Sequence, residues 1–125
     1  GITVQKLGEA EVMAAAGIRD MLLTFNVVGR HKAERLAALA RETDIKVVSD
    51  NADVLGFLAE AARHAGRNIA VMVECDTGAA RNGVQTPAAA ADLAQAIDRT
   101  QGLTFGGLMT LPKNGARRQM AEFLE

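Results

Sequence analysis

Two acids and one arginine lie close together near the middle of the chain. Glu74 and Asp76 end the run of residues 69–76, which is apolar at both odd and even positions until that end. Such a run is typical of a strand buried on both faces in a parallel sheet. Arg81 follows in a glycine-containing loop. Polar residues at the carboxyl end of a strand lie where α/β folds place their ligands, and a carboxylate and a guanidinium there can form a charge-assisted hydrogen bond.

Strands of this kind alternate with helices along the whole chain. Thr86 and Pro87, for example, indicate a helix cap followed by a proline at the first helical position. Alternation at this period predicts a parallel sheet with right-handed crossovers. The predicted strands are residues 2–4, 20–25, 45–48, 69–76 and 103–110, and the predicted helices are residues 9–16, 30–41, 54–65, 87–101 and 116–124.

The predicted βα units fit two architectures. A doubly wound sheet of five strands has the right length, whereas a (β/α)₈ barrel needs about 250 residues and eight strands. The count alone therefore favours the doubly wound sheet. Its usual functional motifs are missing, however. Gln5 and Lys6 stand where a phosphoacceptor domain needs acids, and the glycine-rich fingerprints of nucleotide-binding domains are absent.

Composition limits the classes of function. The chain has 125 residues, 49% of them apolar, which is enough for one globular domain. Its net charge is −1 and no basic stripe is interleaved with aromatic residues, so we expect no nucleic-acid partner. No apolar run approaches the roughly 20 residues of a membrane span, and the residues from Gly1 onward lack the charged and apolar regions expected of a signal peptide. A soluble, cytoplasmic protein is the expectation.

Few side chains are available for acid–base or thiol chemistry. There is no tyrosine, and the only histidines, His31 and His64, fall among charged residues of predicted helices, so we expect them on solvated faces. Cys75 is the only cysteine, which favours a reducing compartment. It is predicted to face the packed helices and to be a core thiol, because neighbouring acids disfavour a thiolate.

Three segments together resemble one enzyme family. They are Thr3–Val12 (TVQKLGEAEV), the VECDTG stretch that begins at Val73 and continues through Arg81 to Pro87, and Gly107–Thr110 (GLMT). In this order they resemble the D-threonine aldolases, which are alanine-racemase-like, fold-type III pyridoxal phosphate enzymes together with D-serine dehydratase. The resemblance implies an α/β fold: five parallel strands of an eight-stranded (TIM) barrel, incomplete in this chain. Residues 1–125 would be strands two to six of that N-terminal barrel domain, and the C-terminal β-domain would be absent.

The resemblance also implies roles for particular residues. Arg81 matches the arginine that approaches the phenolic oxygen of pyridoxal phosphate, where a cation stabilises the phenolate. Our hypothesis is that Glu74 orients Arg81 by a charge-assisted hydrogen bond. Gln5 would lie near the mouth of the cofactor site, and Asp76 would either contribute to that site or only accept hydrogen bonds from loop amides. The tips of the two strands between carry one polar residue each, Asn26 and Asp50.

On this template several functional groups lie outside the chain. The lysine that forms the Schiff base would lie upstream of Gly1, so none of the lysines here, Lys6, Lys32, Lys46 and Lys113, is that residue. The ligands of a divalent metal would follow Glu125. Leu111 stands where relatives carry an aromatic residue or a histidine. We therefore expect no catalytic residue and no metal ligand in this chain, and no activity from it alone.

The implied activity is a lyase reaction on a small D-amino acid substrate. A D-threonine-aldolase-like enzyme would cleave D-3-hydroxy amino acids to glycine and an aldehyde with pyridoxal phosphate and a divalent metal. The alternatives are a D-serine dehydratase or an amino-acid racemase of the same fold, or a non-catalytic α/β module without cofactor. Five strands of a barrel leave two open edges, so we expect a homodimer or coverage by missing segments.

Overall fold

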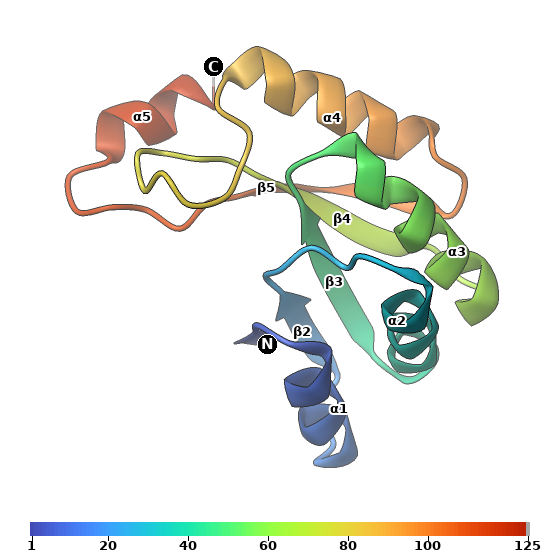
Figure 1. The fold of residues 1–125 in the computed structure, drawn as a ribbon. Coiled ribbons are helices and arrows are strands. Elements are labelled where there is room, and N and C mark those ends of the chain that lie inside the picture. The colour runs from blue at the N-terminus through green and yellow to red at the C-terminus, as the bar shows by residue number, and fades with distance from the viewer. Residues whose placement is uncertain (125) are drawn as a thin grey trace.

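The computed structural model describes residues 1–124, and its five strands alternate with helices along the chain (Figure 1). The first half contains β1 (Ile2–Val4), α1 (Leu7–Ala15), β2 (Asp20–Leu23), α2 (Arg30–Glu42) and β3 (Asp44–Ser49). The second half contains the 3₁₀ helix η1 (Ala52–Val54), α3 (Leu55–Ala65), β4 (Ile69–Glu74), α4 (Pro87–Arg99), β5 (Leu103–Met109) and α5 (Arg117–Glu122). The predicted βα alternation is confirmed.

The strands form one parallel sheet in the order β1-β2-β3-β4-β5. Each strand therefore pairs with its neighbours in the chain, for example Met21 with Ile45 and Val47 with Val71. A doubly wound sheet reverses its strand order at a switch point, whereas a barrel does not. The preference for a doubly wound sheet that came from residue count is wrong, because the number of strands does not specify their order. Over residues 1–124, β1 and β5 do not pair, so this section of a barrel is open.

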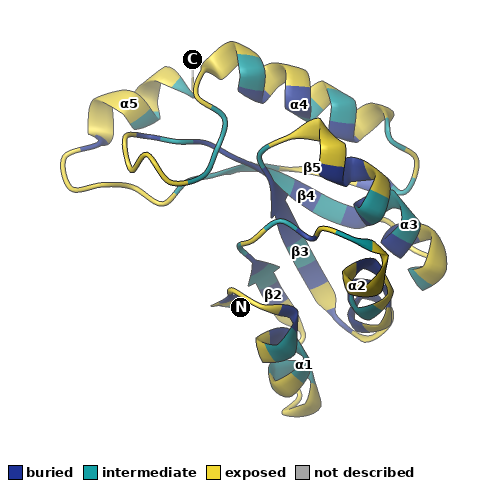
Figure 2. Ribbon diagram, in the orientation of Figure 1, coloured by how far each residue is buried: buried dark blue, intermediate teal, exposed yellow. Residues whose placement is uncertain are grey.

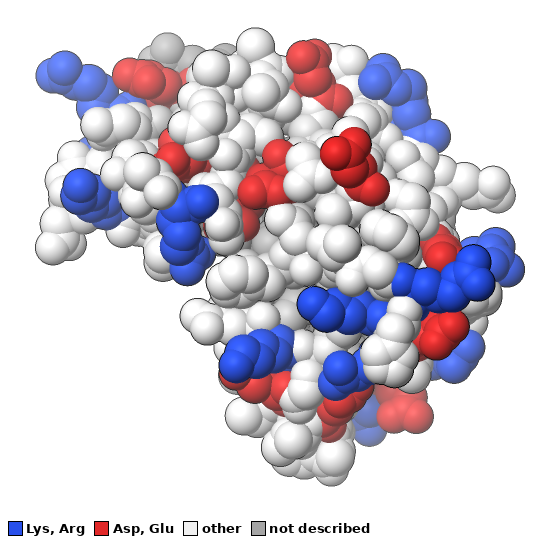
Figure 3. Space-filling view, viewed as in Figure 1, with Lys and Arg blue, Asp and Glu red and all other residues white. Residues whose placement is uncertain are grey.

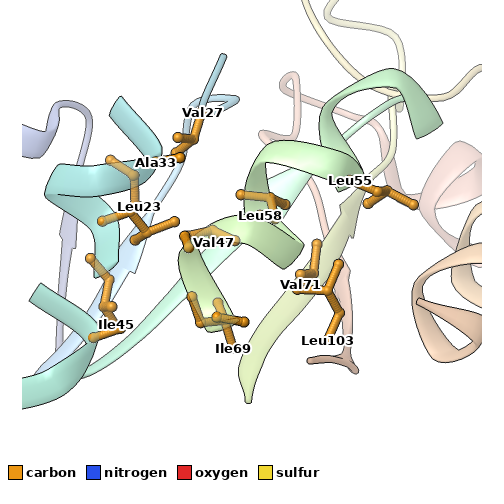
Figure 4. Close-up of a cluster of buried hydrophobic side chains, with 14 of the residues drawn as sticks. Leu23, Val27, Ala33, Ile45, Val47, Leu55, Leu58, Ile69, Val71 and Leu103 are labelled. Atoms are coloured by element: carbon orange, nitrogen blue, oxygen red, sulfur yellow. The ribbon is translucent and has the colours of Figure 1, made fainter. Parts of the chain in front are cut away.

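The hydrophobic core lies between the sheet and the helices on one of its faces (Figure 4). Val47 of β3 and Val71 of β4 are fully buried there against Leu58 of α3. On the opposite face of β3, Lys46 is partly exposed whereas Val48 is fully buried. The prediction that the strands are buried on both faces thus holds for the helix-covered face and only in part for the inside of the open sheet. Figure 2 shows the buried positions concentrated along β3 and β4.

Some element ends differ from the prediction. The first helix begins at Leu7 rather than at residue 9, because the Glu9 carboxylate accepts hydrogen bonds from the backbone N–H groups of Gln5 and Lys6 at 2.8 and 3.3 Å. The second strand ends at Leu23 and leaves residues 24–26 as a loop. The third strand is longer than predicted, and the last helix, α5, is shorter and mostly exposed.

Acidic and basic side chains are interspersed on the surface in Figure 3, and neither sign forms a continuous patch on that face. Among the helices of residues 1–124, none is long and apolar enough to cross a membrane.

The cap of α4 provides a local test of stability. The Thr86 hydroxyl oxygen accepts a hydrogen bond from the Ala89 N–H at 3.1 Å, as the predicted helix start requires. Thr86→Ala is expected to lower the free energy of unfolding by about 1 kcal/mol, because it removes this acceptor. Thr86→Ser keeps the hydroxyl and should stay within a few tenths of a kcal/mol of the parent. Urea unfolding followed by circular dichroism measures both, and an equal loss in the two variants would contradict the capping role.

Candidate active site

The loop after β4 folds back tightly on the end of its own strand. The Val84 N–H donates to the Glu74 carbonyl at 2.8 Å, and the Asp76 N–H donates to the Val84 carbonyl at 3.0 Å. Gly83 lies where the loop meets the strand end and has φ +113°. A Cβ at this position would lie 2.5 Å from the Asp76 nitrogen and 2.6 Å from the Cys75 carbonyl carbon. Only glycine fits a position with this conformation and this close backbone contact.

Asp76 organises the start of the same loop. Its Oδ1 accepts hydrogen bonds from the N–H groups of Gly78 at 2.9 Å and Ala80 at 3.1 Å, and its Oδ2 accepts one from Gln85 Nε2 at 3.2 Å. The Ala80 amide is the main reason that the pKa of Asp76 lies below its usual value. In this structure Asp76 therefore acts on loop amides, which was one of its two predicted roles.

Arg81 extends from this loop between an acid and an aromatic ring. Its Nη2 lies 3.6 Å from Glu74 Oε1, and its guanidinium carbon lies 5.5 Å from the centre of the Phe25 ring. The Arg81 side chain is 41% exposed and that of Glu74 is 3% exposed. The predicted pairing of Arg81 with Glu74 is thus present as an ion pair, at a distance longer than a hydrogen bond. Phe25, in the loop that follows β2, was not singled out in the sequence, although its place next to Asn26 at a predicted strand tip was a signal for it.

Glu74 is a buried acid with an unused oxygen. Its Oε2 is buried and has no hydrogen-bond partner among the described residues, and the same holds for Asn26 Oδ1. Burial raises the pKa of Glu74, Arg81 counteracts this, and the charge of Asp50 raises it further. Buried acceptors without a donor are rare in folded proteins and mark positions where a ligand or water completes the structure.

Asp50 lies at the tip of β3 and connects three strand ends. Its Oδ1 accepts hydrogen bonds from the side-chain amides of Asn26 at 2.7 Å and Asn51 at 2.8 Å, and its Oδ2 accepts one from the Gly83 N–H at 3.2 Å. Burial by itself would raise the pKa of Asp50, but these three hydrogen bonds together keep it below its usual value. Asp50 therefore remains a carboxylate beside the loop that carries Arg81.

The raised pKa of Glu74 predicts a pH trend in stability. Between the ordinary glutamate pKa and the raised one, the folded state binds more protons than the unfolded state, so stability falls as pH rises through this window. Glu74→Gln cannot ionise. The free energy of unfolding of this variant, relative to that of the parent, should therefore increase as pH rises above the ordinary glutamate pKa of about 4. Denaturant unfolding of both proteins across this range measures the difference.

Asp50→Asn is the matched control for this trend because the pKa of Asp50 is shifted in the opposite direction. A lowered pKa contributes stability above the ordinary aspartate pKa, and that stability is lost as pH falls. The loss of stability in Asp50→Asn should thus grow as pH rises toward and through the ordinary aspartate pKa of about 4. A flat Glu74→Gln difference over its own range would contradict the assignment of Glu74 as a destabilised buried acid.

Gln5 lies at the end of β1, apart from the ion pair. It borders an open cavity of about 810 Å³ that Phe25 and Asn26 also line. Within residues 1–124, no hydrogen bond or ion pair joins the Gln5 side chain to Glu74, Asp76 or Arg81. The structure thus brings together three of the four predicted site residues and leaves Gln5 at the edge.

The remaining candidates behave as structural residues. Cys75 is 3% exposed within the core cluster, and burial together with the Glu74 charge raises the pKa of its thiol, which confirms the prediction of a core thiol. His31 and His64 are exposed, as expected for solvated helix faces. In the part of the chain that the structure describes, no group of three or more histidine, cysteine or acidic side chains could hold a metal ion.

Comparison with known proteins gives consistent matches over 86% or more of the chain. Residues 1–125 match the family described as alanine racemase, N-terminal domain. The chain is 42% identical to a D-threonine aldolase from an Arthrobacter species over 86% of its length, and 36% identical to a 3-hydroxy-D-aspartate aldolase from Paracoccus denitrificans (strain Pd 1222) over 98%. It spans only 28% and 32% of the lengths of these relatives.

A solved structure shows the same arrangement. The crystal structure of D-threonine aldolase from Filomicrobium marinum superimposes with a TM-score of 0.83 at 42% sequence identity, and the match covers 86% of this chain and 29% of that one. The order and direction of the five strands therefore agree with those of a section of an alanine-racemase-like barrel, and the expected fold class is confirmed.

Proposed function

This chain belongs to the alanine racemase N-terminal domain family, and we propose that it forms strands two to six of the barrel of a pyridoxal-phosphate-dependent lyase acting on D-3-hydroxy amino acids. The observation that carries the proposal is the pair of Arg81 with Glu74 at the carboxyl end of β4, in a chain whose relatives include two aldolases of D-amino acids. The C-terminal β-domain of such an enzyme would lie outside these residues.

The residues present fit an anionic, aromatic cofactor. Arg81 carries five N–H donors and is 41% exposed, so most of them are free to reach a ligand oxygen beyond Glu74. The unpartnered Glu74 Oε2 and Asn26 Oδ1 are acceptors that a ligand or its waters can complete. When bound, pyridoxal phosphate supplies the electron sink that stabilises negative charge at the substrate Cα.

The roles of this chain's own residues follow from their contacts. Arg81 would donate to the phenolic oxygen of the cofactor and keep that oxygen deprotonated. Glu74 would orient Arg81 from the buried side and Phe25 would cover its outer face. Asp76 would stabilise the conformation of the loop by accepting hydrogen bonds from backbone amides of the loop. Gln5 would line the mouth of the site beside the open cavity.

The substrate class is a small D-amino acid with a hydroxyl on Cβ. Cleavage of its Cα–Cβ bond gives glycine and an aldehyde, and we favour this reaction over dehydration or racemisation because both relatives compared above are aldolases. A divalent metal would assist, with its ligands outside this chain. We further propose a cytoplasmic location, consistent with the single buried cysteine, and coverage of the open sheet by further segments or a second subunit.

The test uses the full-length product of the native gene. Its intact mass should lie well above the 13.2 kDa of these residues. The purified protein should show the visible absorbance of bound pyridoxal phosphate, and it should convert D-threonine to glycine and acetaldehyde. Release of ammonia and a 2-oxo acid instead would establish dehydration. A protein that takes up no pyridoxal phosphate would overturn the proposal and leave a non-catalytic α/β module.

A further inference from the structure

Asp50 stands outside the ion pair of Arg81 and Glu74 but contacts the loop on which Arg81 is carried. We propose that Asp50 is a positioning residue that anchors this loop at Gly83 and so determines where the Arg81 guanidinium lies. The anchor itself is a property of the chain alone. Its consequence for cofactor binding rests on the function proposed above.

The carboxylate of Asp50 is held in one orientation before it meets the loop. Two side-chain amides, from Asn26 at 2.7 Å and from Asn51 at 2.8 Å, donate to the same oxygen, Oδ1. The first amide comes from the loop after the preceding strand and the second from the next residue in the chain, so the two hydrogen bonds together fix the orientation of the carboxylate. The second oxygen, Oδ2, is left to accept the Gly83 N–H at 3.2 Å.

The anchored amide lies close to the residue that it positions. Gly83 is two residues after Arg81, and its backbone packs directly on the backbone of Cys75 and Asp76. The first part of the loop is held by Asp76, which binds the amides of Gly78 and Ala80. The backbone is therefore held on both sides of Arg81, by the Asp76 carboxylate before it and by the Asp50 carboxylate after it.

The contacts of the Arg81 guanidinium are too long to fix its position by themselves. Its ion pair with Glu74 measures 3.6 Å and its contact with the Phe25 ring 5.5 Å, and 41% of the side chain is exposed. A long, partly exposed arginine on a free loop samples many rotamers. Fixing the backbone on both sides of Arg81 reduces this freedom and keeps the guanidinium over Phe25 and beside Glu74.

An ionised aspartate suits this position better than an amide of the same shape. All three groups that hydrogen-bond to the Asp50 side chain are donors. A carboxylate is an acceptor at both oxygens, whereas an asparagine must turn its NH₂ group toward at least one of these donors. Asp50→Asn therefore keeps the size of the side chain and breaks the anchor.

The experiment measures amide hydrogen exchange at residues 80–84 by mass spectrometry in the full-length protein without cofactor. Asp50→Asn should accelerate exchange there by about tenfold, because the Gly83 amide loses a charged acceptor. Asn26→Ser leaves the carboxylate in place but frees its orientation, and should act in the same direction by a smaller factor. Asp92→Asn removes a charge from the exposed face of α4 and should change nothing at this loop.

Titration with pyridoxal phosphate separates the two proposals. Faster exchange together with a Kd for pyridoxal phosphate raised several-fold in Asp50→Asn supports the anchor and its consequence. Faster exchange in a protein whose parent does not bind pyridoxal phosphate retains the anchor and overturns the proposed function. Unchanged exchange in both Asp50→Asn and Asn26→Ser, with the parent binding the cofactor, overturns the anchor and leaves the function standing.

Discussion

Gly83→Ala is expected to lower the free energy of unfolding by about 2 to 6 kcal/mol, because it combines an unfavourable backbone conformation with a steric clash. The residue has φ +113°, and a Cβ would stand 2.5 Å from the Asp76 nitrogen and 2.6 Å from the Cys75 carbonyl carbon. These are backbone atoms of the two residues that follow β4, and they cannot move aside as a flexible side chain can. Either the loop lifts from the strand end or the strand end shifts.

Gly78→Ala is the matched control for this prediction. Gly78 also has a positive φ, +102°, but nothing lies within 4 Å of the Cβ it would gain. Gly78→Ala should therefore lower the free energy of unfolding only by the cost of the unfavourable backbone conformation, about 1 to 3 kcal/mol. Denaturant unfolding of the two variants isolates the steric part of the Gly83 effect. Equal losses would mean that the loop does not pack on the strand end as described.

On the proposed function, Arg81→Gln is expected to reduce kcat/KM of the full-length protein by about 10² to 10³, because it would remove the cation proposed to keep the phenolic oxygen of the cofactor deprotonated. The same variant should then bind pyridoxal phosphate more weakly, and its cofactor absorbance should change because that oxygen would lose its charged donor. Arg81→Lys keeps the charge but lacks the planar fork and the stacking surface over Phe25, so it should recover only part of the activity.

The control for Arg81 is an arginine at the opposite edge of the sheet. Arg99→Gln removes an exposed arginine at the end of α4, just before the amino end of β5, and should leave both cofactor affinity and kcat/KM close to those of the parent. An Arg81→Gln enzyme with unchanged affinity, absorbance and rate would show that Arg81 is only a surface residue. In that case the ion pair with Glu74 would have no role in the site.

The local elements could be predicted from the sequence because their signals are local. Buried strands show as short apolar runs, and all five were predicted with ends within a few residues of those observed. Gly66 adopts the left-handed conformation that ends α3, and Thr86 with Pro87 begins α4 as predicted. Glu74, Asp76 and Arg81 could be singled out because they follow one strand within a few residues, and their resemblance to a known family pointed to the barrel.

Interactions between distant residues were decided by the tertiary structure alone. The strand order that excludes a doubly wound sheet depends on which strands pair, and no local pattern encodes that choice. The hydrogen bond from Gly83 to Asp50 joins residues 33 positions apart, and the ring of Phe25 contacts Arg81 across one intervening strand end, that of β3. Each needs the sheet to curve and the loops to converge. The sequence by itself therefore determined the elements and the chemical groups at their ends, and only the packing of parallel strands in sequential order brought Asp50, Phe25, Glu74 and Arg81 to one place.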